Sequence, residues 1–506
     1  MYTIRQRLLA GLIGSVLIGG CSVIPIDSAR DSDPYTAVKQ SRIQIQGKEG
    51  GPNVPRVIIE LADPVEAVDP ALIEVRTAGR LRKVRQVYVS DQEGRPQAGG
   101  RFITLDLTTP FDAERVRYHA SPFGYDTGKL MNVWATEYRV QATIPSLYIG
   151  GKKYSLSIDE DLIDRRFSPD TASFNVRSTF SGTYRNPKTR RSERLTLQTA
   201  AFQPEHLQGG ERNPLIIWLH GQGEGGTDPD IVLLGNEAIA LAKPPIQSYF
   251  SAGDQHGAYV LVVQTPTYWM DEGDGTNGGG AGHSRYTGIL MDTIRQYVAS
   301  NPDVDPKRIY IGGNSNGGYM TMEMIIEHPD EFAAAYPICE AYAFNELQRN
   351  ARGDYVQNPD GFASGSFLST RKRWLTDGKI ERIRDLPIWF IASADDDIVT
   401  PAKYSLPSYR ALLNAGADNA WFSYFQSIEG SDEPSVRYPG HFSWIYVLND
   451  QVRGVQDRKS ILNADPDDPT AGFKADNLNY GGHANASVGA KTYDNLFIWM
   501  NDQRKP

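Results

Sequence analysis

The sequence predicts two domains, an all-β domain followed by an α/β domain with a mainly parallel sheet. Over residues 41–175, short alternating or β-branched runs such as "RVIIEL", "RQVYVS" and "RFITLDL" are separated by turn residues. Runs at this spacing are typical of a β-sandwich of roughly immunoglobulin size. Over residues 176–506, apolar runs such as "LIIWLH" and "AYVLVVQTP" alternate with helical ones such as "RYTGILMDTIRQYVAS". Apolar strands that alternate with helices indicate a parallel sheet covered on both faces.

The composition supports a folded protein and argues against a nucleic-acid partner. The chain has 506 residues, of which 40% are apolar and 22% charged, as in ordinary globular proteins. Its formal net charge of -9 gives no basic surface on the scale that a phosphate backbone requires. We therefore expect no nucleic-acid binding.

The N-terminal residues predict export. Residues 1–20 combine Arg5 and Arg7 with an apolar run over residues 8–20, which is shorter than the roughly 20 residues needed to span a bilayer. This pattern indicates a signal peptide rather than a membrane-spanning helix.

The end of this segment, Ile18-Gly19-Gly20-Cys21, resembles the lipobox of bacterial lipoproteins. In such proteins the cysteine is acylated and becomes the mature N-terminus, so Cys21 is a candidate lipidation site. The alternative is an ordinary signal peptide with a chance cysteine. We expect residues 21–40 to form a polar tether and the protein to be a membrane-anchored lipoprotein of the outer membrane or cell surface.

A candidate nucleophile lies in the pentapeptide Gly313-Asn314-Ser315-Asn316-Gly317. The G-x-S-x-G pattern is weak alone, but here it follows the strand-like run "RIYIGG" and opens a helical run, as a nucleophile elbow requires. Glycines on both sides suit a tight turn that a neighbouring segment approaches closely. Ser315 is therefore expected at the tip of the turn. The alternative is an ordinary strand-to-helix turn.

A serine nucleophile needs a histidine base and an acid that orients the histidine. In α/β-hydrolases the order along the chain is serine, acid, histidine. His441 follows the strand-like run "AWFSYFQ" and is the favoured base. The alternative is His483, which lies in a long polar insertion over residues 456–487.

Three adjacent aspartates, Asp395, Asp396 and Asp397, follow the strand-like run "LPIWFIAS". An acid of this kind should sit just past a sheet strand, and the turn pattern implied by the resemblance described below makes Asp396 our choice among the three. The other two are expected to face water or to cap the next helix. Glu340, in "YPICEAY", ends the strand after the nucleophile helix and is an alternative acid.

The oxyanion hole needs two backbone N–H groups, one from the residue after the nucleophile and one from an earlier strand-to-helix loop. Asn316 supplies the first. The loop in "LIIWLHGQGEGG" supplies the second, with Gln222 as the favoured donor and His220 expected to be structural.

The same loop matches a dinucleotide-binding fingerprint, Gly221-x-Gly223-x-x-Gly226, which would indicate an oxidoreductase. That interpretation needs an acidic residue ending the next strand about 20 residues further on, and the stretch there is "AIALAKPPIQSYF". The sequence has no H-E-x-x-H motif and no clustered Cys/His ligand set, and the acids of the glycine-rich loop over residues 271–284 do not follow an EF-hand spacing. We therefore expect no cofactor and no metal ion.

Six segments, taken together and in order, resemble the α/β-hydrolases often labelled predicted peptidases. This group is close to polyhydroxybutyrate-depolymerase-like and feruloyl-type esterases, and some members carry an N-terminal immunoglobulin-like domain. The resemblance covers most of residues 180–450 and implies an α/β-hydrolase fold. The segments are "PLIIWLHGQGEGGTD", "VVQTPTYWMD", "RIYIGGNSNGGYMTMEMI", "YPICEAY", "PIWFIASADDDIVTP" and "GHFSWIY".

The resemblance implies Ser315, Asp396 and His441 as a catalytic triad, and the loop over residues 221–223 as an oxyanion donor. The family habit of a G-x-x-D-x-x-V-like turn aligns Asp396 with the acid and Val399 with the valine. One departure is that the acid strand ends in Ala-Ser where relatives commonly have His-Gly, which bears on the choice among the aspartates.

The predicted function is that of a secreted, lipid-anchored serine hydrolase that cleaves carboxylic esters, small or polymeric, through an acyl-enzyme. Tyr268, Trp269 and Trp444 lie near the motifs and are expected to line the substrate pocket; the alternative is that they are core residues. A peptidase or amidase with the same triad is one alternative function. Another is a surface binding protein whose hydrolase domain is inert.

Overall fold

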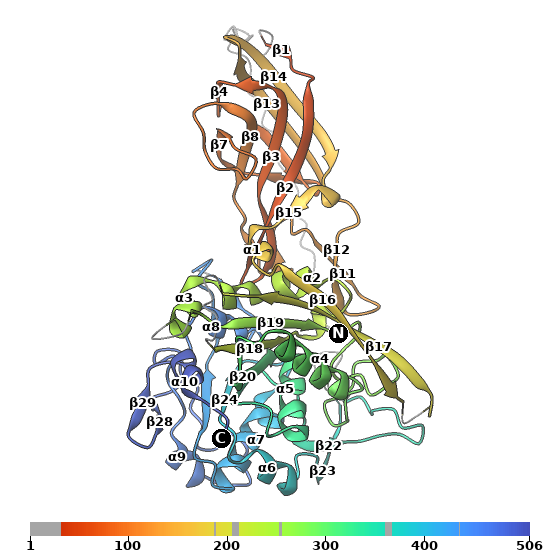
Figure 1. Cartoon of the computed structure of the whole chain (residues 1–506), viewed down its shortest axis with the longest axis vertical. Coiled ribbons are helices and arrows are strands. Elements are labelled where there is room, and N and C mark those ends of the chain that lie inside the picture. Colours follow the sequence, from red (N-terminus) through yellow and green to blue (C-terminus); the bar gives the residue numbers. More distant parts are fainter. Residues whose placement is uncertain (1–31, 187–188, 205–211, 252–255, 360–366, 435) are drawn as a thin grey trace, which may run out of the picture.

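A computed structural model describes residues 32–186, 189–204, 212–251, 256–359, 367–434 and 436–506 (Figure 1). The expected signal peptide over residues 1–20 and the candidate lipidation site Cys21 lie outside these described residues. Within them, no helix combines the length and the apolar character that crossing a membrane would demand.

The N-terminal part is a sandwich of two β-sheets. One sheet has the strand order β1-β14-β13-β5-β6, with β4 also paired to β13, and the other has the order β15-β2-β3-β8-β7. The first sheet contains β1 (Asp33–Pro34), β14 (Lys152–Asp161), β13 (Arg139–Ile149), β4 (Ala67–Val68), β5 (Glu74–Thr77) and β6 (Arg80–Arg82). The second contains β15 (Arg166–Phe167), β2 (Val38–Lys48), β3 (Gly51–Val65), β8 (Gly100–Leu107) and β7 (Val84–Ser90).

Alternating side chains of both sheets form the core of the sandwich. In β2, for example, Ile43 and Ile45 are buried while Gln44 between them is half-buried. Part of the expected tether over residues 21–40 belongs instead to the sandwich, because β1 pairs with β14 and β2 begins at Val38. The polar composition of this stretch concealed an edge strand.

The C-terminal part is built on one eight-stranded sheet with the order β16-β17-β19-β18-β20-β21-β24-β25. Strand β17 is antiparallel to both of its neighbours, and the other pairings are parallel. The strands are β16 (Val176–Arg185), β17 (Ser192–Phe202), β18 (Asn213–Leu219), β19 (Tyr259–Gln264), β20 (Val304–Asn314), β21 (Ala334–Ile338), β24 (Ile388–Ser393) and β25 (Ala420–Phe425).

Helices cover both faces of this sheet, because side chains of the buried strands alternate between two apolar cores. Ile217 of β18 points into the core beneath α4, α5, α6 and α7, while Trp218 points into the core beneath α2, α3, α8 and α10. The helices are α1 (Pro169–Ala172), α2 (Pro229–Gly235), α3 (Pro244–Gln247), α4 (Thr287–Ser300), α5 (Asn316–Glu327), α6 (Asp377–Ile383), α7 (Ser405–Asn414), α8 (Trp444–Leu448), α9 (Arg458–Leu462) and α10 (Leu496–Asp502).

Short elements complete both parts. Two hairpins of the sandwich lie next to the α/β part: β11–β12 is at the junction in Figure 1, and β9–β10 carries Tyr118, whose hydroxyl is 3.4 Å from that of Tyr438. The short strands are β9 (Phe111–Asp112), β10 (Arg117–Tyr118), β11 (Phe123–Asp126), β12 (Met131–Trp134), β22 (Asn345–Leu347), β23 (Ser369–Arg373), β26 (Ile428–Glu429), β27 (Arg437–Tyr438), β28 (Ala486–Val488) and β29 (Lys491–Tyr493). The 3-10 turns are η1 (Ile163–Arg165), η2 (Gln222–Glu224), η3 (Ala238–Ala242), η4 (Ser248–Phe250) and η5 (Pro401–Lys403).

Buried polar contacts join the two parts. Glu49 at the end of β2 is only 2% exposed and accepts hydrogen bonds from the backbone and hydroxyl of Ser431, both at 2.7 Å. Nε1 of Trp134 in β12 donates to Asp228 at 2.8 Å. These contacts hold the sandwich against the edge of the sheet where the strands β18, β20 and β24 end.

Candidate active site

Ser315 occupies a sharp turn between β20 and α5. Its backbone has φ 56° and ψ -112°, a strained conformation for a residue with a side chain. A Cβ atom added to Gly313 would lie 2.2 Å from the carbonyl oxygen of Leu219, and one added to Gly317 would lie 2.0 Å from it. Only glycine fits at either position, so the G-x-S-x-G pattern reflects the close passage of β18 behind the turn.

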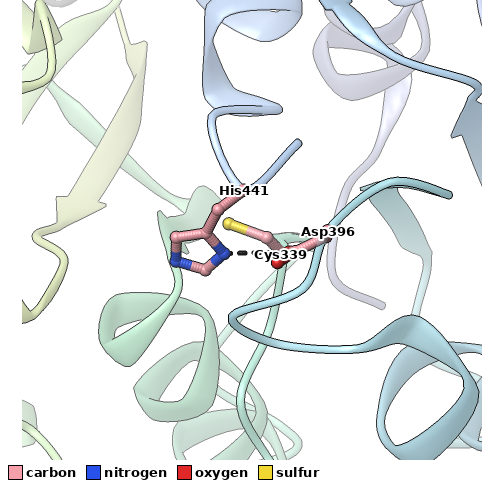
Figure 2. A group of neighbouring side chains, drawn as sticks. All are labelled: Cys339, Asp396 and His441. Carbon is pink, nitrogen blue, oxygen red and sulfur yellow. Dashed lines mark hydrogen bonds and ion pairs between the residues drawn. The ribbon is translucent and has the colours of Figure 1, made fainter. Parts of the chain in front are cut away.

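His441 and Asp396 are hydrogen-bonded to each other. Asp396 lies in the turn after β24, and its Oδ2 is 2.8 Å from Nδ1 of His441 (Figure 2). Its other oxygen, Oδ1, accepts from the backbone N–H groups of Ile398 and Val399, each at 2.9 Å. The carboxylate is therefore fixed by two backbone donors on one side, and it holds the histidine as the tautomer with a proton on Nδ1.

Two opposing effects act on the pKa of His441. Burial alone would lower it, because the charged imidazolium loses hydration. The carboxylate of Asp396 attracts the imidazolium and accepts its hydrogen bond, the sulfur of Cys339 acts in the same direction, and together these effects outweigh burial. The net result is a pKa well above the usual value of histidine.

The two neighbouring aspartates have different surroundings. Asp395 accepts from the hydroxyl of Ser393 at 2.6 Å and pairs with Arg437 at 2.8 Å. Asp397 is exposed to solvent. Of the three adjacent carboxylates, Asp396 is the one bonded to His441.

Cys339 is a neighbour of this pair that the sequence interpretation did not include. It directly follows β21, has φ 37°, and is buried. Its sulfur, a nitrogen of His441 and a carboxylate oxygen of Asp396 lie within 4.8 Å of one another (Figure 2). The alternative acid Glu340 instead accepts from the backbone N–H of Tyr342 at 2.6 Å. The end of β21, where we considered Glu340 as the acid, thus places the thiol of Cys339 beside His441.

His220 shapes the oxyanion loop from within. It has 0% exposure, and its Nε2 accepts from the backbone N–H of Thr265 at 3.1 Å, so its Nδ1 donates to the carbonyl of Gly221 at 2.6 Å. Burial lowers the pKa of His220 to about 4, which keeps the ring neutral. A neutral ring that makes two hydrogen bonds fits the structural role expected for His220.

The two candidate oxyanion donors lie at the ends of neighbouring strands. Gln222 begins the single turn η2 after β18, and Asn316 begins α5 after β20. Strands β18 and β20 are adjacent and parallel, so both loops emerge at the same edge of the sheet. Their side chains are linked through a third residue, Asn277, which bonds to both.

Ser315, His441 and Gln222 line one cavity of about 500 Å³. About half of its wall comes from the sandwich domain, including residues 50–52 and the hairpin β11–β12 with Phe123 and Tyr125. The sequence interpretation placed every candidate active-site residue in the α/β domain and none in the sandwich. It therefore missed that this domain closes the candidate active site.

Glu224 connects the oxyanion loop to the sandwich. Its Oε1 accepts from Nδ2 of Asn132 in β12 at 3.1 Å, and the residue is 5% exposed. Burial raises the pKa of Glu224 to about 7, although the hydrogen bond from Asn132 and the nearby His441 act in the opposite direction. An ionisable group with a pKa near neutrality thus lies in the wall of the cavity.

The three aromatic residues predicted to line the pocket have different positions. Trp444 lines the cavity and meets the ring of His441 edge-on at 5.9 Å. Trp269 is 0% exposed and packs against His220 at 5.3 Å, outside the residues that line this cavity. Tyr268 is also outside the lining; its hydroxyl donates to the carbonyl of Lys129 and so holds the sandwich hairpin.

Among the described residues, two groups of side chains have the composition of metal ligands, and in each the histidine already pairs with a carboxylate. The first is Cys339 with Asp396 and His441, in which His441 and Asp396 form the bond described above. In the second, Nδ1 of His283 lies 2.9 Å from Glu323, next to the ammonium of Lys379. We assign a metal to neither. The alternative base His483 pairs with Asp476 at 2.8 Å, away from the cavity lining.

The fold and the site define a two-domain α/β-hydrolase with an immunoglobulin-like domain in front. Comparison with known proteins agrees with this class. Residues 43–155 match the family described as esterase Ig-like N-terminal domain, and residues 290–422 match the prolyl oligopeptidase family. A solved structure described as a thermostable esterase has 21% sequence identity and a TM-score of 0.58, covering 82% of this chain and 97% of that chain.

Two curated relatives are bacterial depolymerases. The chain is 31% identical over 133 residues to poly(3-hydroxyalkanoate) depolymerase C of Paucimonas lemoignei, which is 25% of this chain and 27% of that protein. It is 33% identical over 139 residues to poly(3-hydroxybutyrate) depolymerase of Ralstonia pickettii, which is 26% of each. The chain thus spans about a quarter of the length of these relatives. The comparisons confirm the predicted fold class and the predicted resemblance to depolymerases and esterases.

Proposed function

We propose that the protein is a serine hydrolase that cleaves carboxylic esters, with Ser315 as nucleophile, His441 as base and Asp396 as the acid that orients it. One observation carries the proposal. A serine held in a strained turn and a histidine bonded to a buried carboxylate line the same cavity. Similarity to esterases and depolymerases supports the same reaction class.

In the proposed mechanism, Oγ of Ser315 attacks the ester carbonyl while Nε2 of His441 takes its proton. The negative oxygen that forms is stabilised by the backbone N–H groups of Asn316 and Gln222. His441 then returns the proton to the leaving alcohol, which gives an acyl-enzyme and frees the alcohol. Water, deprotonated by His441, hydrolyses the acyl-enzyme and regenerates Ser315. Throughout, Asp396 stabilises the imidazolium and keeps Nδ1 protonated.

The cavity favours a substrate with an apolar portion. Phe123, Leu130, Ile398 and Trp444 contribute apolar side chains to its wall, and about 500 Å³ accommodates a small ester or the end of a polymer chain. The polymers named for the two curated relatives are polyesters, so oligomeric hydroxyalkanoates are candidate substrates.

A substrate panel tests the reaction class. We expect hydrolysis of p-nitrophenyl esters of short and medium acyl chains, and of 3-hydroxybutyrate oligomers, with little activity on peptide p-nitroanilides. Amides need protonation of a poorer leaving group, so the same triad can act on esters without cleaving peptides. Faster cleavage of p-nitroanilides than of matched esters would instead support a peptidase or amidase.

We also propose that the protein is exported and anchored by lipid at Cys21. The support is the sequence of residues 1–21 described above, with arginines, an apolar run and a lipobox-like ending. Metabolic labelling with radioactive palmitate should mark the wild-type protein and leave Cys21→Ser unlabelled, with Cys339→Ser as the matched control. Equal labelling of the Cys21 variant, or none of the wild type, would contradict the anchor.

A further inference from the structure

Asn277 connects the side chains of the two candidate oxyanion residues. It lies in the glycine-rich loop over residues 271–284, between β19 and α4. Its Nδ2 donates to Oε1 of Gln222 at 2.7 Å, and its Oδ1 accepts from Nδ2 of Asn316 at 2.7 Å. One amide therefore spans the two loops that emerge from the ends of β18 and β20.

The orientation of these amides follows from a backbone donor. The N–H of Met270 donates to Oδ1 of Asn316 at 3.2 Å. An N–H can only donate, so the oxygen of Asn316 must face Met270 and its NH₂ must face Asn277. The oxygen of Asn277 then accepts that bond, and its NH₂ is left to donate to Gln222. The three hydrogen bonds are therefore assigned with a donor and an acceptor in each.

The loop that carries Asn277 is itself firmly held. The buried carboxylate of Asp271 accepts from the N–H groups of Gly273 and Gly275 at 2.7 and 2.9 Å. Gly280 has φ 84°, and a Cβ added to it would lie 1.9 Å from the carbonyl oxygen of Ala341, so the loop packs directly on the segment after β21. Asn277 is thus presented to Gln222 from a rigid support.

Gln222 needs such support more than Asn316 does. Asn316 is 0% exposed and is part of a twelve-residue helix, whereas Gln222 is half-buried and lies in the three-residue turn η2. Within the described part of the chain, the bond from Asn277 is the one hydrogen bond made by the Gln222 side chain. Stabilisation of an oxyanion depends on donors fixed at hydrogen-bonding distance before the charge develops.

We infer that Asn277 is a positioning residue of the oxyanion hole, which holds the backbone N–H of Gln222 at a set distance from that of Asn316. This inference rests on the proposed function, in which those two groups stabilise the tetrahedral intermediate. Asn277 acts through Gln222 and needs no contact with the substrate. Its removal should therefore slow the chemical step more than it weakens substrate binding.

The test is steady-state kinetics of Asn277→Ala and Asn277→Asp on a short p-nitrophenyl ester. The alanine variant should lose about 10- to 100-fold in kcat, less than the 10² to 10³ typical of deleting a donor, with KM changed by no more than about 2-fold. The aspartate variant keeps the bond from Asn316, and Gln222, whose side chain makes no other hydrogen bond within the described residues, can turn its amide to donate to the new carboxylate, so this variant should retain more kcat than the alanine variant. Thr276→Ala, at an exposed neighbouring position, is the matched control and should keep wild-type kcat.

Two further measurements separate positioning from other roles. The affinity for phenylboronic acid, which forms a tetrahedral adduct with a serine nucleophile, should fall with kcat in Asn277→Ala while the melting temperature stays near that of Thr276→Ala. In a double-mutant cycle, Gln222→Ala should add little to Asn277→Ala. If the fold-losses in kcat of the two single variants multiply in the double variant, Asn277 acts independently of Gln222 and the inference is overturned.

The result also distinguishes this inference from the proposed function. If the wild type hydrolyses esters and reacts with a fluorophosphonate, and Asn277→Ala retains wild-type kcat, the positioning role is wrong while the hydrolase function stands. If the wild type neither hydrolyses esters nor reacts with the probe, the proposed function itself fails.

Discussion

Replacing Ser315 by alanine is expected to reduce kcat/KM for ester hydrolysis by about 10⁵- to 10⁶-fold, the scale seen when a serine protease loses its nucleophile. The hydroxyl is the group proposed to form the acyl-enzyme. Among the described serines that line the cavity, Ser315 alone has a backbone with positive φ. Covalent labelling by a fluorophosphonate probe, read by intact-protein mass spectrometry, should disappear at the same time.

The matched control is Ser487→Ala, which removes an exposed serine hydroxyl in β28 far along the chain from the cavity lining. It should retain both hydrolysis and labelling. Unchanged hydrolysis in Ser315→Ala would show that the catalytic interpretation is wrong. Wild-type protein that binds ester polymers without labelling or turnover would favour the alternative of a surface binding protein with an inert hydrolase domain.

Asp396→Asn is expected to lower kcat by about 10⁴-fold, because it imposes the wrong tautomer on His441. The N–H groups of Ile398 and Val399 require an oxygen at the Oδ1 position, so the new amide nitrogen must face Nδ1 of His441. Nδ1 then has to accept a hydrogen bond, and the proton moves to Nε2. A protonated Nε2 cannot take the proton of Ser315.

The neighbouring aspartates provide controls that differ by one position. Asp395→Asn loses an ion pair with Arg437, whose side chain is 64% exposed, and Asp397→Asn changes an exposed carboxylate. Surface pairs of this kind contribute about 0–1 kcal/mol to stability, so both variants should keep kcat within a few-fold of wild type. A sensitive Asp395 or Asp397 with a tolerant Asp396 would move the acid to a different residue of the triplet.

The same variants predict a change in pH dependence. His441 must be neutral to act as a base, and its pKa is raised well above the usual value, so kcat/KM should rise with pH through that pKa and level off at alkaline pH. Asp396→Asn removes the carboxylate whose attraction offsets the effect of burial on the pKa of His441. Its residual activity should therefore have an inflection at lower pH than the wild type. An inflection that does not move would show that another group controls the profile.

The fold class was accessible from the sequence because its signals are local. Buried parallel strands leave continuous apolar runs, and the close passage of Leu219 behind the elbow demands glycine at 313 and 317. The comparisons confirm the resulting class. The candidate residues Ser315 and His441 were chosen from chain order and strand ends, and the structure brings them to one cavity.

The rest of the site depends on contacts that leave no local pattern. Asn132 and Glu224 are 92 residues apart, and neither belongs to a motif that predicts their bond. Cys339 lies in the segment "YPICEAY" beside the alternative acid Glu340, but only the parallel pairing of β21 and β24 brings it beside Asp396. Trp269 was placed in the pocket because it neighbours a motif, whereas an aromatic residue at such a position can equally fill the core, as its full burial shows.

Both domains contribute to the wall of the cavity, but they contribute different kinds of residues. The groups proposed to break and make bonds all belong to the α/β domain, while much of the surface that would meet the remainder of a substrate belongs to the sandwich. Changes in hairpins β9–β10 and β11–β12 can therefore alter which molecules are accepted without disturbing the elbow or the turn after β24. The residues proposed for catalysis and this share of the cavity wall are therefore encoded in separate stretches of the gene.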